Sequence, residues 1–74
     1  MATVIIRKPE TSVTDKDIEL VQLLSNGAKR TTIGLKMGIS VRTVEDRLDK
    51  LRARLGCNSV PHLVGDFFRN NLIE

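Results

Sequence analysis

Apolar residues recur every three or four positions in several stretches of this chain, which is the spacing of one face of an α-helix. The apolar positions of the first stretch are Ile18, Leu20, Val21, Leu23 and Leu24. Thr14 can cap this helix, and Asp17 three residues later makes an imperfect capping box. Because Asn26 and Gly27 follow the last leucine closely, we expect the helix to end there.

A second, shorter helix is predicted around Ile33 and Met37, with Gly38 as a left-handed C-cap. The start of this helix is open, because the side chain of Lys29 has no acceptor for a backbone N–H. Either Thr31 caps the helix, or the turn is capped by other means.

The third helix has the clearest limits, because Ser40 is a good N-cap and Gly56 a good stop, with about fifteen residues between them. Its apolar seam is Val44, Leu48, Leu51 and Leu55. One flank of the seam is basic and consists of Thr43, Arg47, Lys50 and Arg54. The face opposite the seam is acidic on balance and consists of Arg42, Glu45, Asp46, Asp49 and Ala53.

A fourth helix should begin at Val60 and Pro61, after Ser59, and fray at Asn70 and Asn71. The residues expected to close the core from this helix are Val60, Leu63, Val64 and Phe67. An adjacent apolar stripe is more than one small domain can easily cover, so we predict a dimer surface there. The residues of this dimer surface are Pro61, Val64, Gly65, Phe68 and Leu72.

Four helices with a three-residue turn between the second and third define an all-α fold. A short helix, a tight glycine turn and a longer basic helix form the helix-turn-helix arrangement. We therefore predict one helix-turn-helix domain over residues 13–74. Residues 1–12 are expected to be a flexible arm, in which residues 3–6 could pair as a short edge strand.

Composition narrows the class of protein. The 74 residues (8.3 kDa) suffice for one small domain, and no apolar run is long enough to span a membrane. The single cysteine, Cys57, cannot form an internal disulfide and is expected to be buried, while His62 should lie on the surface. We find no catalytic triad, phosphate loop or metal-binding pattern. The sequence thus predicts a cytoplasmic protein that is not an enzyme and uses no cofactor or metal.

The positive charge is concentrated in the middle of the chain. The net charge is +3, whereas residues 27–56 alone carry eight basic and three acidic side chains. A polyanion is the simplest partner for such a basic centre. The alternative is a solvated helix face whose charges pair along the helix, for which Asp46–Lys50 and Asp49–Arg52 have the right spacing.

Several short motifs resemble those of the LuxR/GerE-type helix-turn-helix, the DNA-binding domain of bacterial quorum-sensing regulators and NarL/FixJ response regulators. The resemblance covers about residues 13–68. Its most specific parts are the Ile-Ser-x-x-Thr-Val-Glu segment at residues 39–45 and the Leu-Gly stop at residues 55–56. The resemblance implies a four-helix domain whose third helix enters the major groove and whose fourth helix often mediates dimerisation. It also implies backbone contact for Thr43, phosphate contact near Arg47 and a base-facing position for Asp49.

The chain departs from the family pattern at three places. Residues 29–32, Lys-Arg-Thr-Thr, replace the usual Ser-Asn-Lys-Glu and add positive charge. Val60 stands where the family usually has arginine. Finally, Glu45, Asp46 and Asp49 bring three carboxylates to the face expected to meet the groove, where a carboxylate can accept a hydrogen bond from cytosine N4.

We therefore predict a transcriptional regulator that binds double-stranded DNA, as a homodimer, with another regulator or RNA polymerase as further candidate partners. The predicted DNA-binding residues are Lys29, Arg30, Thr31, Arg42, Thr43, Glu45, Asp46, Arg47, Asp49, Lys50 and Arg54. The alternative is a helix-turn-helix protein that does not bind DNA and inhibits another regulator through its acidic face. The promoter-reading region of sigma factors is a third possibility, against which the fourth helix argues.

Overall fold

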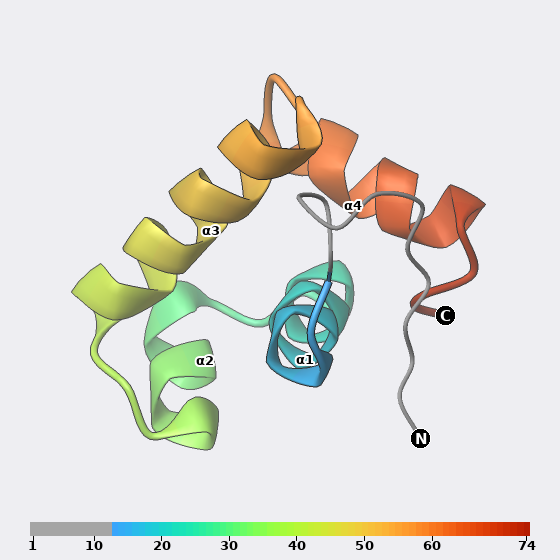
Figure 1. Ribbon diagram of the computed structural model, residues 1–74. Helices are drawn as coiled ribbons and strands as arrows, with labels where there is room; N and C mark the ends of the chain where they lie inside the picture. The colour runs from blue at the N-terminus through green and yellow to red at the C-terminus, as the bar shows by residue number, and fades with distance from the viewer. Residues whose placement is uncertain (1–12) are drawn as a thin grey trace.

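The computed structural model describes residues 13–74, and these form four α-helices with no strand (Figure 1). The helices are α1 (Asp15–Ser25), α2 (Arg30–Met37), α3 (Val41–Leu55) and α4 (Val60–Arg69). The predicted all-α, four-helix fold is confirmed. The predicted arm at residues 1–12, with its possible strand at 3–6, lies outside the described residues.

Three of the helices start with a side-chain cap at the predicted position. The Thr14 hydroxyl accepts from the N–H of Asp17, and the Asp17 carboxylate accepts from the N–H of Thr14, both at 3.1 Å. Ser40 accepts from the N–H of Thr43 at 3.0 Å, and Ser59 caps α4 in the same way. These local hydrogen bonds satisfy backbone N–H groups that a helix start leaves without partners.

The α2 helix begins differently. It follows Lys29 and has no side-chain hydrogen bond at its N-cap, so Thr31 is not the cap. It ends as predicted at Gly38, whose φ of 71° lies in the left-handed region that glycine adopts without strain.

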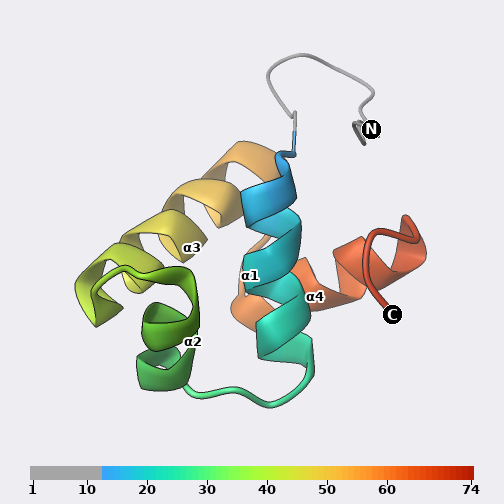
Figure 2. The same cartoon turned by 90° about the horizontal axis from the view of Figure 1, so that it is seen from below.

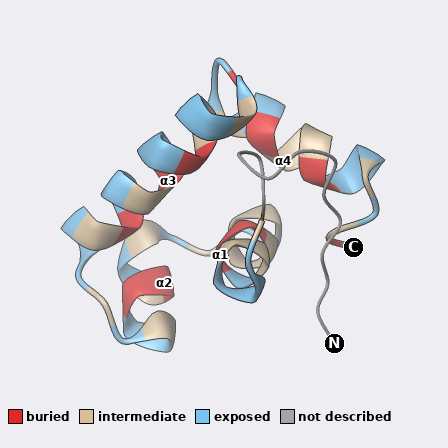
Figure 3. Cartoon of the chain, viewed as in Figure 1, coloured by how far each residue is buried: buried red, intermediate tan, exposed pale blue. Residues whose placement is uncertain are grey.

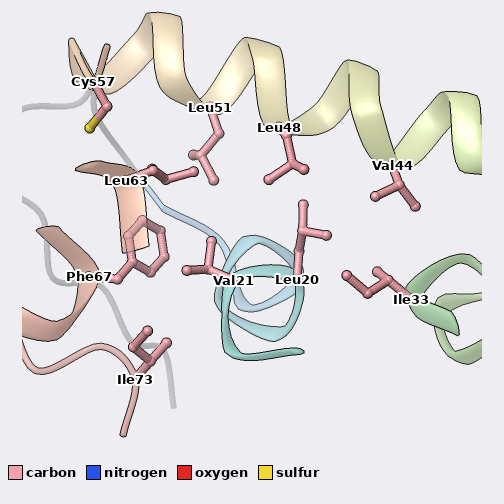
Figure 4. Close-up of a cluster of buried hydrophobic side chains, with 10 residues drawn as sticks. All are labelled: Leu20, Val21, Ile33, Val44, Leu48, Leu51, Cys57, Leu63, Phe67 and Ile73. Atoms are coloured by element: carbon pink, nitrogen blue, oxygen red, sulfur yellow. The ribbon is translucent and has the colours of Figure 1, made fainter. Parts of the chain in front are cut away.

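One hydrophobic core joins all four helices (Figure 4). The α3 side chains in it are Val44, Leu48 and Leu51. Leu48 and Leu51 point toward α1, which carries Leu20 and Val21, and Val44 points toward Ile33 of α2 (Figure 4). The other buried residues are Ile33, Cys57, Leu63, Phe67 and Ile73.

Some residues predicted to lie in the core, among them Leu55, Val60 and Val64, are only half-buried. Leu55, in the last turn of α3, is half-buried and packs against the edge of the core. Val60 is half-buried and does not belong to the core cluster, because it is the first residue of α4 and precedes the turn that faces α1. The prediction that Val60 helps to close the core is therefore wrong.

The α1 helix lies at the centre of the arrangement, with α2 and α4 on opposite sides of it (Figures 1 and 2). The α3 helix packs on both α2 and α4, so its inner side is covered while its outer side has no neighbouring helix. Within residues 13–74, no helix has the length and apolar character needed to cross a bilayer.

Candidate nucleic-acid interface

The outer side of α3 is exposed along the length of the helix (Figure 3). Its exposed residues are Val41, Arg42, Glu45, Asp46, Asp49, Lys50, Ala53 and Arg54. The predicted division into a buried seam and an exposed, charged face is thus confirmed. Thr43 and Arg47, on the basic flank, are half-buried.

A close contact between α2 and the following turn sets the orientation of α3. Gly34 is buried, and a Cβ atom built at this position would lie 2.6 Å from the carbonyl oxygen of Ile39. The N–H of Ile39 in turn donates to the carbonyl of Gly34 at 2.9 Å. Because only glycine permits this approach, the corner between α2 and α3 is tight, as a helix-turn-helix requires.

Each acidic side chain on the outer side of α3 lies beside an arginine. The pairs are Arg30 with Glu45 at 3.2 Å, Arg42 with Asp46 at 3.9 Å and Arg52 with Asp49 at 3.1 Å. These contacts balance the three carboxylates locally, which reduces the repulsion that they would exert on a polyanion. The pairs are exposed, so they contribute little to stability.

Of the two intrahelical pairs that the alternative interpretation of a solvated helix face would use, one is present. Asp49 pairs with Arg52, as expected, but Asp46 pairs with Arg42 and not with Lys50. Arg42 is in the first turn of α3, where the helix dipole disfavours a cation, and a carboxylate one turn later offsets this effect. The expectation for Asp46 and Lys50 is therefore wrong, and Lys50 has no ion-pair partner in the described part of the chain.

The basic side chains at this surface differ in whether they form an ion pair with a carboxylate. Lys29 and Lys50 are exposed and Arg47 is half-buried, and none of the three forms an ion pair with another residue in the range 13–74. Arg54 instead pairs with Asp17 at 3.5 Å, which links the end of α3 to the start of α1. Among the predicted DNA-binding residues, Lys29, Lys50 and Arg47 are the cations that form no ion pair within residues 13–74.

Thr31 and Thr43 complete the predicted set on α2 and α3. Thr31 is exposed in the first turn of α2, next to Arg30. The Thr43 hydroxyl accepts from the Ser40 hydroxyl at 3.0 Å, so this side chain is held at the start of α3. The structure brings the predicted residues of α2 and α3 together through the contact between Arg30 and Glu45.

The residues of the predicted dimer surface on α4 differ in their exposure. Phe68 is 46% exposed and Pro61 is also exposed. Val64 and Leu72 are half-buried and pack against the core, and Gly65 is half-buried. Phe68 is therefore the main apolar side chain that this helix leaves for a partner.

Sequence reasoning missed two exposed apolar side chains, Leu35 and Val41. Leu35 on α2 is 84% exposed, more than Phe68 or Val41. The exposure of Leu35 could have been inferred from the sequence, because Leu35 follows the core residue Ile33 by two positions and so points to the opposite side of the helix.

Cys57 and His62 take the positions expected of them. Cys57 is 7% exposed, and burial, with a smaller contribution from the charge of Asp66, raises the pKa of its thiol. His62 is exposed, and its Nδ1 accepts from the N–H of Asn58 at 3.1 Å.

Across residues 13–74 there is no cluster of three or more histidine, cysteine or acidic side chains that could hold a metal ion.

Comparison with known proteins adds one relative. The transcriptional regulatory protein YdfI of Bacillus subtilis (strain 168) is 34% identical to this chain over 53 residues, which are 72% of this chain and 25% of YdfI. The chain thus spans about a quarter of the length of this curated relative. No protein-family model and no solved structure matches the chain.

Proposed function

We propose that this chain is a DNA-binding domain of a transcriptional regulator, of the LuxR/GerE helix-turn-helix type, and that it acts in the cytoplasm. The observation that carries the proposal is the tight corner at Gly34 and Ile39, which joins α2 to an α3 whose outer side is uncovered. A helix presented in this way fits the major groove of duplex DNA. The similarity to a protein named as a transcriptional regulatory protein supports the same conclusion.

In this proposal α3 enters the major groove and the cations around it contact phosphates. Arg47 and Lys50 are the main phosphate contacts, because no carboxylate of residues 13–74 pairs with them. Arg42, 86% exposed in its side chain, reaches base edges together with Glu45. The other proposed contacts are Lys29, Arg30, Thr31, Thr43, Asp46, Asp49 and Arg54.

We further propose that the domain binds DNA as a homodimer through α4. Phe68 supplies an exposed aromatic side chain, which is typical of the centre of an interface. A two-fold dimer would place two α3 helices about one turn of DNA apart, on a site with matching symmetry.

The experiment that tests this function is selection from a random pool of duplex DNA at two salt concentrations, followed by sequencing of the retained fraction. We expect an enriched motif and a steep loss of binding at the higher salt, because phosphate contacts release counterions. If the folded protein retains no DNA at low salt, the proposal is wrong.

The acidic side chains of α3 favour a second candidate function. Glu45, Asp46 and Asp49 are all exposed on the surface that would meet DNA, and this surface could instead bind a basic protein partner, such as another regulator. Charge reversal separates the two functions. If this surface binds a protein partner, changing Asp46→Lys and Asp49→Lys together should strengthen binding to DNA of any sequence. If the surface reads DNA bases, the same changes should alter the selected motif.

A further inference from the structure

The ion pair between Arg30 and Glu45 joins the two helices of the proposed interface. Nε of Arg30, the first residue of α2, donates to Oε2 of Glu45, in the second turn of α3, at 3.2 Å. The other two pairs on the outer side of α3, Arg42–Asp46 and Asp49–Arg52, lie within α3 itself. Arg30 of α2 therefore restrains the position of the Glu45 side chain on α3.

Both partners keep unused hydrogen-bonding groups. The Arg30 and Glu45 side chains are 34% and 50% exposed. Arginine has five N–H donors, and toward residues 13–74 Arg30 uses only its Nε–H, so within this range the four donors on its terminal nitrogens have no acceptor. Within residues 13–74, no group donates to the second oxygen of the Glu45 carboxylate.

We propose that Arg30 and Glu45 form one recognition unit that selects cytosine, an inference that rests on the proposed DNA-binding function. In this unit Arg30 holds the Glu45 carboxylate in place, and the free carboxylate oxygen accepts a hydrogen bond from the exocyclic N4 amine of a cytosine in the major groove. The terminal nitrogens of Arg30 donate to a phosphate of the adjoining backbone. Glu45 is the specificity-determining residue and Arg30 is its positioning residue.

In this proposal the positive charge of Arg30 offsets the negative charge that Glu45 brings close to DNA. A carboxylate brought into the groove approaches two rows of phosphates, which repel it. Arg30 cancels this charge at the place where it arises, and its planar guanidinium restricts the orientation of the carboxylate. The pair Arg42–Asp46 is less suited to this role, because its atoms are 3.9 Å apart and both side chains are more than half exposed.

The test is selection from a random duplex pool with the wild type, Glu45→Ala, Arg30→Gln and the double variant. We expect the wild-type motif to contain a preferred cytosine, and Glu45→Ala to lower that preference about fivefold or more while other positions keep theirs. Arg30→Gln should lower the same preference and weaken binding to all sequences. The double variant should bind more tightly than Arg30→Gln alone, because the uncompensated carboxylate is gone.

Matched controls separate the local effect from a change in net charge. Glu19→Ala and Lys16→Gln make the same charge changes at exposed positions on α1 and should leave the motif unchanged. Thermal unfolding of each variant checks that the fold is intact, and we expect midpoints close to that of the wild type, since exposed pairs contribute little to stability.

Two results would overturn the inference. An unchanged cytosine preference in Glu45→Ala would show that Glu45 reads no base. Tighter binding of Glu45→Ala to all sequences would show that Glu45 only masks Arg30 from phosphates. A folded wild type that retains no duplex DNA would refute the proposed function itself, and this result is distinct because it appears before any variant is compared.

Discussion

Gln22 and Glu74 are joined by two hydrogen bonds across 52 positions of sequence. Nε2 of Gln22 donates to the carbonyl oxygen of Glu74 at 3.1 Å, and the N–H of Glu74 donates to Oε1 of Gln22 at 3.0 Å. One side-chain amide thereby pairs with both backbone groups of a residue beyond the last helix. This contact holds the segment after α4 against α1, where Ile73 is only 4% exposed.

The first prediction concerns this segment. Ile73→Ala should lower the free energy of unfolding by about 2 kcal/mol or more, because it removes buried apolar volume. Gln22→Ala should cost about 1 kcal/mol, because the two hydrogen bonds are exposed and water replaces them in part. Chemical denaturation measures both values, with Glu19→Ala on the exposed side of α1 as the control. An Ile73→Ala variant as stable as the wild type would show that this segment does not pack on the core in solution.

The second prediction contrasts two helical glycines. Gly34→Ala should destabilise the domain by about 1–3 kcal/mol, because its Cβ would lie 2.6 Å from the carbonyl oxygen of Ile39. Gly65→Ala should stabilise it by about 0.5–1 kcal/mol, because alanine favours helix and the new Cβ meets only the end of the Arg69 side chain at 3.6 Å. Thermal unfolding of the two variants tests the corner between α2 and α3, and equal effects would contradict the close approach at Gly34.

The third prediction concerns pH. Burial raises the pKa of the Cys57 thiol above its ordinary value of 9.0, so above this pH the unfolded chain loses a proton that the folded chain keeps. The contribution of Cys57 to stability is therefore complete below pH 9.0 and is lost as the pH rises through the folded-state pKa. Between pH 8 and 10.5, roughly the range over which a thiol titrates, the wild type should lose more stability than Cys57→Val. Parallel slopes for the two proteins would show that the thiol is not protected from ionisation.

The fourth prediction concerns self-association. If the proposed homodimer forms through α4, Phe68→Glu should weaken it while leaving the fold intact, because Phe68 is 46% exposed and changes at exposed positions have small effects on stability. Its neighbour Phe67 is 1% exposed, so Phe67→Ala should instead cost about 3–5 kcal/mol of stability. Sedimentation over a range of concentrations measures association. If Phe68→Glu associates as strongly as the wild type, α4 does not form the dimer through this residue.

The four helices and the side-chain caps of α1, α3 and α4 were predictable because they depend on neighbours in sequence. The Thr14–Asp17 capping box, for example, involves residues three positions apart, and its two hydrogen bonds follow from helix geometry. The apolar seam of α3 was also readable, since the periodicity of Val44, Leu48 and Leu51 determines which side is buried.

The contacts between distant residues were not predictable from the same signals. The burial of Ile73 depends on the chain turning back after α4, and no periodic pattern marks that turn. The pair Arg30–Glu45 depends on the angle between α2 and α3. The partner of Asp46 was mistaken because two bases, Arg42 and Lys50, stand at equal spacing from it, and spacing alone does not distinguish them.

The fifth prediction tests the central claim, that α3 binds duplex DNA through Arg47 and Lys50. The measurement is the affinity for a fixed duplex as a function of salt, for the wild type and for Arg47→Gln/Lys50→Gln, with Lys16→Gln as the control. If each side chain neutralises one phosphate, the double variant should lower the slope of log K against log salt by about 1.8, from about 0.9 per phosphate, whereas the control keeps the wild-type slope. Equal slopes for the double variant and the wild type would contradict the claim.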